Sequence, residues 1–266
     1  MIINPYIYGV ATSYDPDAQL FITATGISGT NATATNQLVL DLKAANIWTK
    51  FKAIYPVVGG TATSHKFNLK NPSDTNAAFR LSFVGGWTHS ATGMLPNGTN
   101  AYADTFLIPS TALTNNNTHI SIYSRTNSSG LYFDIGSGQA TGQYFDLALN
   151  ITGNVFADQY NNSTARITTA NANSQGFYIS SRTTSSVFKL FKNAAQLGTT
   201  NTGASTGFTS ITSSVYLSAL HEGASNLYFS NRECAFASIG DGLTDAEALA
   251  FRTAVQTFNT TLARQV

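Results

Sequence analysis

Short runs of alternating apolar and polar residues dominate this chain from residue 51 onward. In one of them, Leu131, Phe133 and Ile135 alternate with Tyr132 and Asp134. Similar runs occupy residues 79–83, 120–123, 145–149, 177–179 and 215–217, with Gly, Asn, Ser or Pro in the gaps. Alternation with one apolar face is typical of antiparallel strands, because buried parallel strands read as continuous apolar runs. Many such strands with turn residues between them predict a sandwich or a barrel.

The first 50 residues have a helical pattern instead. Asp15 can cap a helix, Pro16 suits the first helical position, and Gly26 can end the helix. A second helix is expected over residues 32–45, where apolar residues form one stripe. We therefore interpret residues 1–50 as a small helical attachment element.

The C-terminal residues also predict a helix, over 244–263. Thr244 and Glu247 form a capping box, in which each side chain can bond the backbone N–H of the other residue. Phe251 and Phe258 then recur on the apolar stripe, so both side chains should be buried. The stripe needs a partner, most simply the edge or end of the β-sandwich, with a partner subunit as the alternative.

The composition indicates a folded chain with little charge. Charged residues make up 10% of the 266 positions, against about 25% in an average protein. Ser, Thr and Asn together make up roughly a third, while aromatic residues, at 12%, can supply a core. A net charge of +1 argues against a nucleic-acid partner, which needs a basic surface. The sequence has no apolar run long enough to cross a bilayer and no secretory signal pattern at its start, so we expect no membrane insertion.

Three segments share their order and spacing with a known fold family. They are PNGTNAYAD at 96–104, VFKLFKNAAQLG at 187–198 and FASIGDGLTDAE at 236–247. In this order they resemble an early strand, a hairpin with an Asn turn, and the last strand and helix of laminin-G-like domains. The resemblance implies a mainly β protein: an antiparallel β-sandwich of the concanavalin-A-like jelly-roll type over residues 51–266, with the C-terminal helix included.

A second resemblance concerns residues 38–72, LVLDLKAANIWTKFKAIYPVVGGTATSHKFNLKNP. This segment is similar to one that precedes such jelly rolls in tailed-phage structural proteins. The resemblance implies a virion location and a non-enzymatic role in adhesion or decoration, as a fibre, receptor-binding or capsid-decorating protein. Its partners would be other virion proteins and a host-surface glycan, with a homo-oligomer as a further possibility. The alternative is a cellular carbohydrate-binding module of the same fold.

The sequence shows no sign of catalytic chemistry. Glucanases with this fold place closely spaced acids on one strand, and no Glu-x-Asp-x-x-Glu run occurs here. A Gly-x-Ser-x-Gly nucleophile motif is also absent from the sequence. We expect no enzyme activity and no obligatory cofactor. The laminin-G-like resemblance leaves a rim calcium site open, with Asp104 and Asp134 as candidate ligands.

Glycan binding would need aromatic faces for sugar rings to stack on. Trp87 follows a Gly-Gly pair at a predicted strand end or loop, and Tyr102, Tyr132 and Tyr144 lie near loops or opposite the core-facing residues. These four residues are the predicted ligand-binding residues. Trp48 follows the second predicted helix and is interpreted as a packing residue.

Overall fold

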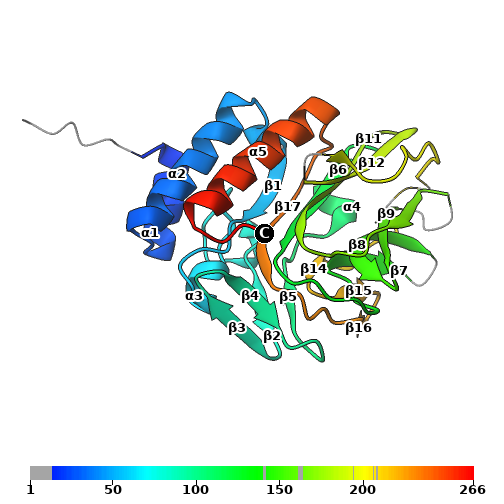
Figure 1. The fold of residues 1–266 in the computed structure, drawn as a ribbon, viewed down its shortest axis with the longest axis horizontal. Helices are drawn as coiled ribbons and strands as arrows, with labels where there is room; N and C mark the ends of the chain where they lie inside the picture. The colour runs from blue at the N-terminus through cyan, green and yellow to red at the C-terminus, as the bar shows by residue number, and fades with distance from the viewer. Residues whose placement is uncertain (1–13, 140–141, 161–163, 194, 206, 208) are drawn as a thin grey trace, which may run out of the picture.

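Two antiparallel sheets stack as a sandwich, and helices cover one side of it (Figure 1). The structure is a computed structural model that describes residues 14–139, 142–160, 164–193, 195–205, 207 and 209–266. The predicted fold class, a mainly β antiparallel sandwich with helical N- and C-terminal elements, is confirmed. The expectation about a secretory signal concerns residues outside the described ranges.

The first sheet contains eight strands within these described ranges, all paired in antiparallel fashion. In spatial order they are β13 (Ala195–Gln196), β12 (Val187–Lys192), β11 (Gly176–Thr184), β6 (Thr118–Ser124), β17 (Cys234–Gly240), β4 (Gly93–Pro96) and β3 (Trp87–Ser90), with β1 (Phe51–Tyr55) also paired to β17.

The second sheet contains nine strands in the part of the chain that the structure describes. In spatial order they are β10 (Arg166–Ala170), β9 (Asn154–Gln159), β8 (Gln143–Ile151), β7 (Ile135–Gln139), β14 (Tyr216–Leu217), β5 (Tyr102–Asp104) and β2 (Ser82–Val84). A short hairpin of β15 (Leu220–Glu222) and β16 (Ser225–Leu227) joins this sheet, with β15 parallel to β7.

The helices lie mainly near the two ends of the sequence. They are α1 (Pro16–Thr25), α2 (Gly29–Ala44), α3 (Ala62–His65), α4 (Pro109–Ala112) and α5 (Asp245–Thr261), with short 3₁₀ turns η1 (Trp48–Lys50) and η2 (Asn76–Ala78). None of the helices found in the described residues combines the length and the apolar character needed to span a bilayer.

The main core lies between the two sheets. Ile120 and Ile122 of β6 share one buried cluster with Phe145, Leu147 and Leu149 of β8. The period-2 pattern predicted the inward orientation of all five residues, and their neighbours in sequence therefore point to the outer faces of the sheets.

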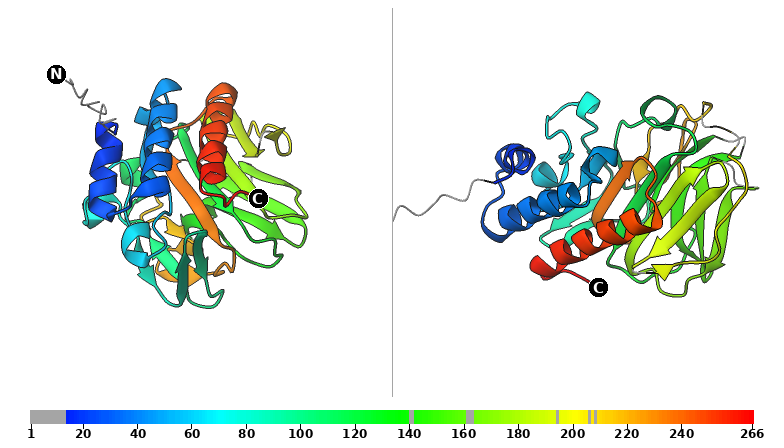
Figure 2. Two further views of the ribbon diagram at one scale, coloured as in Figure 1. Left: turned by 60° about the vertical axis from the view of Figure 1, so that its left-hand side comes forward. Right: turned by 90° about the horizontal axis from the view of Figure 1, so that it is seen from above.

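A second apolar cluster fills the space between the first sheet and the helices. Helices α1, α2 and α5 lie side by side along this sheet (Figure 2). The Phe251 ring of α5 contacts Phe51, Phe177 and Phe236, with ring centroids 4.8, 5.2 and 5.9 Å away. Phe258 is also buried, so the predicted burial of both phenylalanines is confirmed.

The predicted helix caps are present. The Asp15 carboxylate accepts a hydrogen bond from the backbone N–H of Asp17, and α1 ends at Gly26 in the left-handed conformation. The Thr244–Glu247 capping box starts α5, and Glu247 also forms an ion pair with Lys50 at 2.6 Å. This ion pair ties the start of α5 to the end of the N-terminal helical segment.

Some predicted boundaries were wrong. The predicted strand over residues 79–83 starts only at Ser82, because Phe79 has a positive φ of 57° at the end of η2. The predicted strand over residues 131–135 starts only at Ile135. The α2 helix begins three residues before the predicted start at residue 32, at Gly29.

The assignment of residues 1–50 as a separate attachment element stays a prediction. In the structure, the described part of this segment shares its apolar cluster with β1, β17 and α5.

Candidate ligand-binding site

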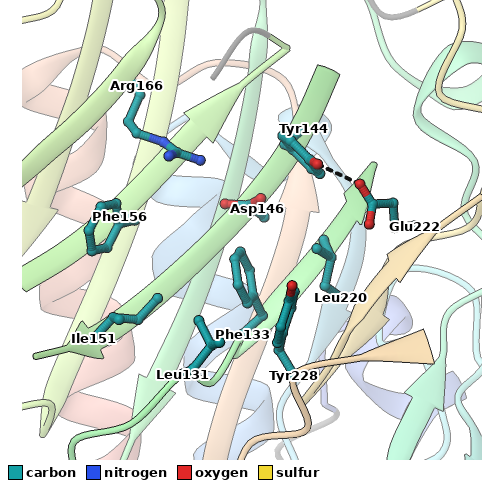
Figure 3. A pocket seen from close by; sticks show the side chains of 10 residues that line it. All are labelled: Leu131, Phe133, Tyr144, Asp146, Ile151, Phe156, Arg166, Leu220, Glu222 and Tyr228. Atoms are coloured by element: carbon teal, nitrogen blue, oxygen red, sulfur yellow. Dashed lines mark hydrogen bonds between the residues drawn. The ribbon is translucent and has the colours of Figure 1, made fainter. Parts of the chain in front are cut away.

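A pocket of ≈ 320 Å³ lies on the outer face of the second sheet (Figure 3). Its floor comes from β8, β9 and β10, and its rim from the β15–β16 hairpin and the chain just before β7. The lining residues are Leu131, Phe133, Tyr144, Asp146, Ile151, Phe156, Arg166, Leu220, Glu222 and Tyr228. No helix of the described residues covers this face, in contrast to the first sheet.

Three charged side chains form a row across neighbouring strands beneath the pocket. Asp146 of β8 pairs in register with Asp158 of β9, which pairs in register with Arg166 of β10. Arg166 donates to both oxygens of Asp158, from Nε at 2.9 and 3.1 Å and from Nη2 at 2.5 Å. This two-pronged contact fixes the guanidinium group, and it raises the pKa of Arg166.

Asp146 is fully buried and is one of the residues that line the pocket at its floor. Neither carboxyl oxygen accepts a hydrogen bond from a donor group among the described residues. Burial, and then the negative charge of Asp158, raise the pKa of Asp146 well above its usual value. Asp146 can therefore hold a proton at moderate pH and donate it to a neighbouring acceptor.

Two glycines of β7 make room for the pocket side chains. Gly136 lies opposite Asp146 and Gly138 lies opposite Tyr144 in the β7–β8 pair. A Cβ atom on Gly136 would lie 2.8 Å from the Cβ of Asp146, and one on Gly138 would overlap the Tyr144 ring. Any larger residue at either position would displace a pocket side chain.

The rim combines a carboxylate with aromatic rings. Glu222 accepts a hydrogen bond from the Tyr144 hydroxyl at 2.5 Å, which leaves this carboxylate facing Asp146 across the pocket (Figure 3). Tyr228 is 40% exposed and adopts a positive φ of 57°, an uncommon conformation for a residue with a side chain. Its ring lies 5.4 Å from that of Phe133. Aromatic faces and acidic groups thus surround one cavity.

Of the four predicted ligand-binding residues, only Tyr144 lines this pocket. Trp87 is the first residue of strand β3, as its predicted place at a strand end allows, but its ring packs on Phe83 at 5.4 Å and its indole N–H donates to the Val84 carbonyl. Tyr102 stacks on Tyr216 at 4.3 Å. Trp87 and Tyr102 are both half-buried by these contacts.

Tyr132 lies beside the pocket segment but turns to Arg232, whose guanidinium lies 5.2 Å from its ring. Trp48, interpreted as a packing residue, packs against the helix cluster, and its ring carries the Lys70 ammonium group at 3.6 Å.

The two candidate calcium ligands have other partners. Asp134 is buried and accepts hydrogen bonds from Arg232, Leu149 and Ser230. Asp104 accepts a hydrogen bond from the backbone N–H of Phe106. The described residues contain no group of three or more His, Cys, Asp or Glu side chains arranged to hold a metal ion. Calcium binding therefore stays a prediction from resemblance.

Sequence reasoning missed most of the pocket. Asp146, Arg166, Glu222 and Tyr228 were not predicted as site residues. One signal could have pointed to Asp146: it lies on the polar face of a strand whose partner strand has glycine at alternate positions. The other residues come from distant parts of the chain, so their convergence depends on strand pairing.

Neither a protein-family model nor a curated protein sequence matches the chain. Among solved structures, it is similar to botulinum neurotoxin type C, with a TM-score of 0.54 and 11% identity, over 80% of this chain and 53% of that one. It is also similar to domain 4 of AbnA, a GH43 extracellular arabinanase from Geobacillus stearothermophilus, with a TM-score of 0.47 and 12% identity, over 76% of this chain and 98% of that one. For the CBM40 of the Ruminococcus gnavus IT-sialidase, the TM-score is 0.41 and the identity 17%, over 52% of this chain and 84% of that one. At these identities the likeness concerns the fold alone, and the neurotoxin match supports a shared β-sandwich.

Proposed function

We propose that this chain is a non-catalytic glycan-binding domain and that its site is the pocket above Asp146. The observation that carries the proposal is a buried carboxyl without a donor at the floor of a pocket with aromatic walls. The Asp146 carboxyl has a second acid, Asp158, as its neighbour. Two buried acids side by side are costly, and a ligand that donates to Asp146 reduces that cost. Sugars offer donors on their hydroxyl groups and apolar C–H faces for aromatic rings.

The size of the cavity agrees with this function. Ligand pockets usually enclose about 300–1,000 Å³ and combine apolar walls with a few polar groups. At ≈ 320 Å³, this pocket is at the lower end and suits one sugar ring of a longer chain. The fold is also compatible, since botulinum neurotoxin type C, which shares the sandwich, interacts with two ganglioside molecules.

A glycosidase is the second candidate, because Asp146 has the raised pKa of a general acid and Glu222 lies across the same pocket. Two contacts favour binding over hydrolysis. The Asp146 carboxyl packs against Asp158, and the Glu222 carboxylate accepts the Tyr144 hydroxyl. A nucleophile or a base would have to give up these contacts to reach a glycosidic bond.

The virion role predicted from the sequence remains a proposal of its own. It would place the same glycan-binding site on a particle surface. Electron microscopy of intact particles would show whether the chain is present there, whatever the outcome for the pocket.

The test is a glycan-array screen of the full chain, followed by calorimetric titration with each glycan that binds. Asp146→Asn removes the carboxyl at the pocket floor with almost no change in shape, and Asp41→Asn, on helix α2, is the matched control. We expect at least tenfold weaker binding for Asp146→Asn and unchanged binding for Asp41→Asn. No binding to any glycan, or equal binding by both variants, would contradict the proposal. Reducing-sugar release that Asp146→Asn abolishes would instead favour the glycosidase.

A further inference from the structure

We propose that the pocket selects a ligand with a protonated amine, so that the preferred glycan contains an amino sugar with a free ammonium group. This inference rests on the proposed glycan-binding function, and it names the chemical class of the sugar.

The charged side chains around the pocket favour a cationic ligand. Asp146 and Glu222 line the cavity, and Asp158 lies directly beneath it. The single cation among the lining residues, Arg166, is bound to Asp158 through both Nε and Nη2. The arginine charge is therefore already neutralised, and the remaining carboxyl groups give the pocket an acidic character.

The walls of the pocket also favour a cation. Four aromatic rings line the cavity, from Phe133, Tyr144, Phe156 and Tyr228. The faces of aromatic rings attract organic cations, and this attraction strengthens when water is excluded. The Arg166 guanidinium already lies 5.5 Å from the Phe156 ring centroid, which shows that one wall accepts a cation.

The acidic side chains of the pocket can accept hydrogen bonds from an ammonium group. An ammonium group has three N–H donors and no acceptor. It could donate to Asp146, which has no donor in the described residues, and to Glu222 across the cavity. A carboxylate-bearing sugar would instead bring a second negative group close to Glu222, with no free cation among the lining residues to receive it.

A change of protonation accompanies this binding. The groups that face Asp146 are Asp158 from β9, Arg166 from β10, Glu222 from β15 and Tyr144 from its own strand. Burial and Asp158 favour the protonated form of Asp146 in the free protein. An ammonium ligand favours the ionised form, so its binding should release a proton from Asp146.

The experiment compares five probes by calorimetry: a glucosamine trisaccharide, the N-acetylglucosamine trisaccharide, cellotriose, sialyllactose and methylammonium. We expect the glucosamine trisaccharide to bind at least tenfold more tightly than the N-acetylated and neutral sugars, and sialyllactose to bind most weakly. Glu222→Gln and Asp146→Asn should each reduce the amine preference to about twofold or less, while Asp41→Asn should keep it. Titrations in buffers of different ionisation enthalpy should report proton release for the wild type and Asp41→Asn, and none for Asp146→Asn.

Equal or tighter binding of the N-acetylated sugar, cellotriose or sialyllactose would overturn the amine inference and leave the glycan-binding function intact. Binding of methylammonium without binding of any sugar, lost in Asp146→Asn, would support the cation site and contradict the glycan function. If none of the probes binds and the array is also blank, both proposals fail.

Discussion

The outer faces of the two sheets have opposite character. The first sheet turns Phe51, Phe177 and Phe236 outward, and helices cover them. The second sheet turns Asp146, Asp158 and Arg166 outward on three neighbouring strands, and a short hairpin with a few rim residues lies beside them. Covering an apolar face with helices stabilises the protein. Covering a row of charged side chains with other parts of the same chain adds little stability, because the charges lose their contact with water.

This contrast separates the stabilising part of the molecule from the part suited to a ligand. Removing a side chain from the helix-covered face should lower stability. Replacing Asp146 on the pocket face should raise stability and weaken binding, because sites that bind ligands often carry groups that destabilise the free protein.

The largest effect should come from Phe251→Ala under helix α5. The Phe251 side chain is 0% exposed and contacts aromatic rings from three strands. Its truncation should lower the free energy of unfolding by about 3–5 kcal/mol, measured by urea denaturation. Leu249→Ala, on the same helix at 52% exposure, is the control, with an expected change of at most about 0.5 kcal/mol. Equal effects of both substitutions would show that α5 does not dock on the sheet.

The next largest effect is a loss of stability at low pH, caused by a histidine on the same helix-covered face. His119 of β6 is fully buried beside Phe51, and burial lowers its pKa to about 4. The unfolded chain binds a proton at this histidine below about pH 6.5, while the folded protein does not. Stability from the neutral histidine is therefore present above that pH and is lost as the pH falls toward 4.

Between pH 7 and pH 5, protonation of His119 in the unfolded chain should lower the free energy of unfolding by about 2 kcal/mol. We expect the free energy of unfolding of His119→Gln to fall less than that of the wild type over the same interval, by about this amount. Urea titrations at both pH values measure the difference. Because His65 and Asp146 are present in both proteins, their own pH effects cancel in the difference. Direct NMR titration of His119 gives a second measurement, and a midpoint near 6.5 would refute the prediction.

On the pocket face, stability should change with pH in the opposite direction. The raised pKa of Asp146 means that the unfolded chain releases this proton at lower pH than the folded protein. The wild type therefore loses stability as the pH rises above about 3.9. Asp146→Asn should be more stable than the wild type at pH 7 by about 1 kcal/mol, and the gain should shrink toward pH 4. A lower melting temperature at pH 7 would show that the carboxyl stabilises the fold.

The same contrast explains what could be predicted from the sequence. The burial of Phe251 and Phe258 follows from spacing within one helix, so local periodicity was sufficient. Alternation identified β6 as a strand, and the laminin-G-like resemblance implied β17. Both strands are buried on both faces, and neither signal could show that helices cover the second face.

The pocket was harder to predict because its residues are separated in sequence. Asp146 has the position of a solvent-facing residue in an alternating strand, and it is buried only because β15 and Phe133 come from elsewhere to enclose it. Phe133 was expected on a strand facing the core, and it lines the pocket instead. Aromatic composition identified Tyr144, but it could not separate it from Trp87 and Tyr102, which pack on other rings.

The smallest effect on stability, and the clearest separation of stability from binding, should come from Tyr228→Ala. The Tyr228 ring is 40% exposed, and the backbone hydrogen bond from Phe133 to its carbonyl does not depend on the side chain. Its truncation should change the unfolding free energy by no more than about 0.5 kcal/mol. It should weaken glucosamine-trisaccharide binding about tenfold, because an aromatic face over a cation contributes on the order of 1–2 kcal/mol.

Tyr102→Ala should instead lower stability and leave binding unchanged, since Tyr102 stacks on Tyr216 away from the pocket lining. We expect a lower melting temperature with unchanged affinity for this variant. If Tyr102→Ala weakens binding and Tyr228→Ala does not, the ligand lies near the sequence-predicted tyrosine, and the open face of the second sheet is not the binding surface.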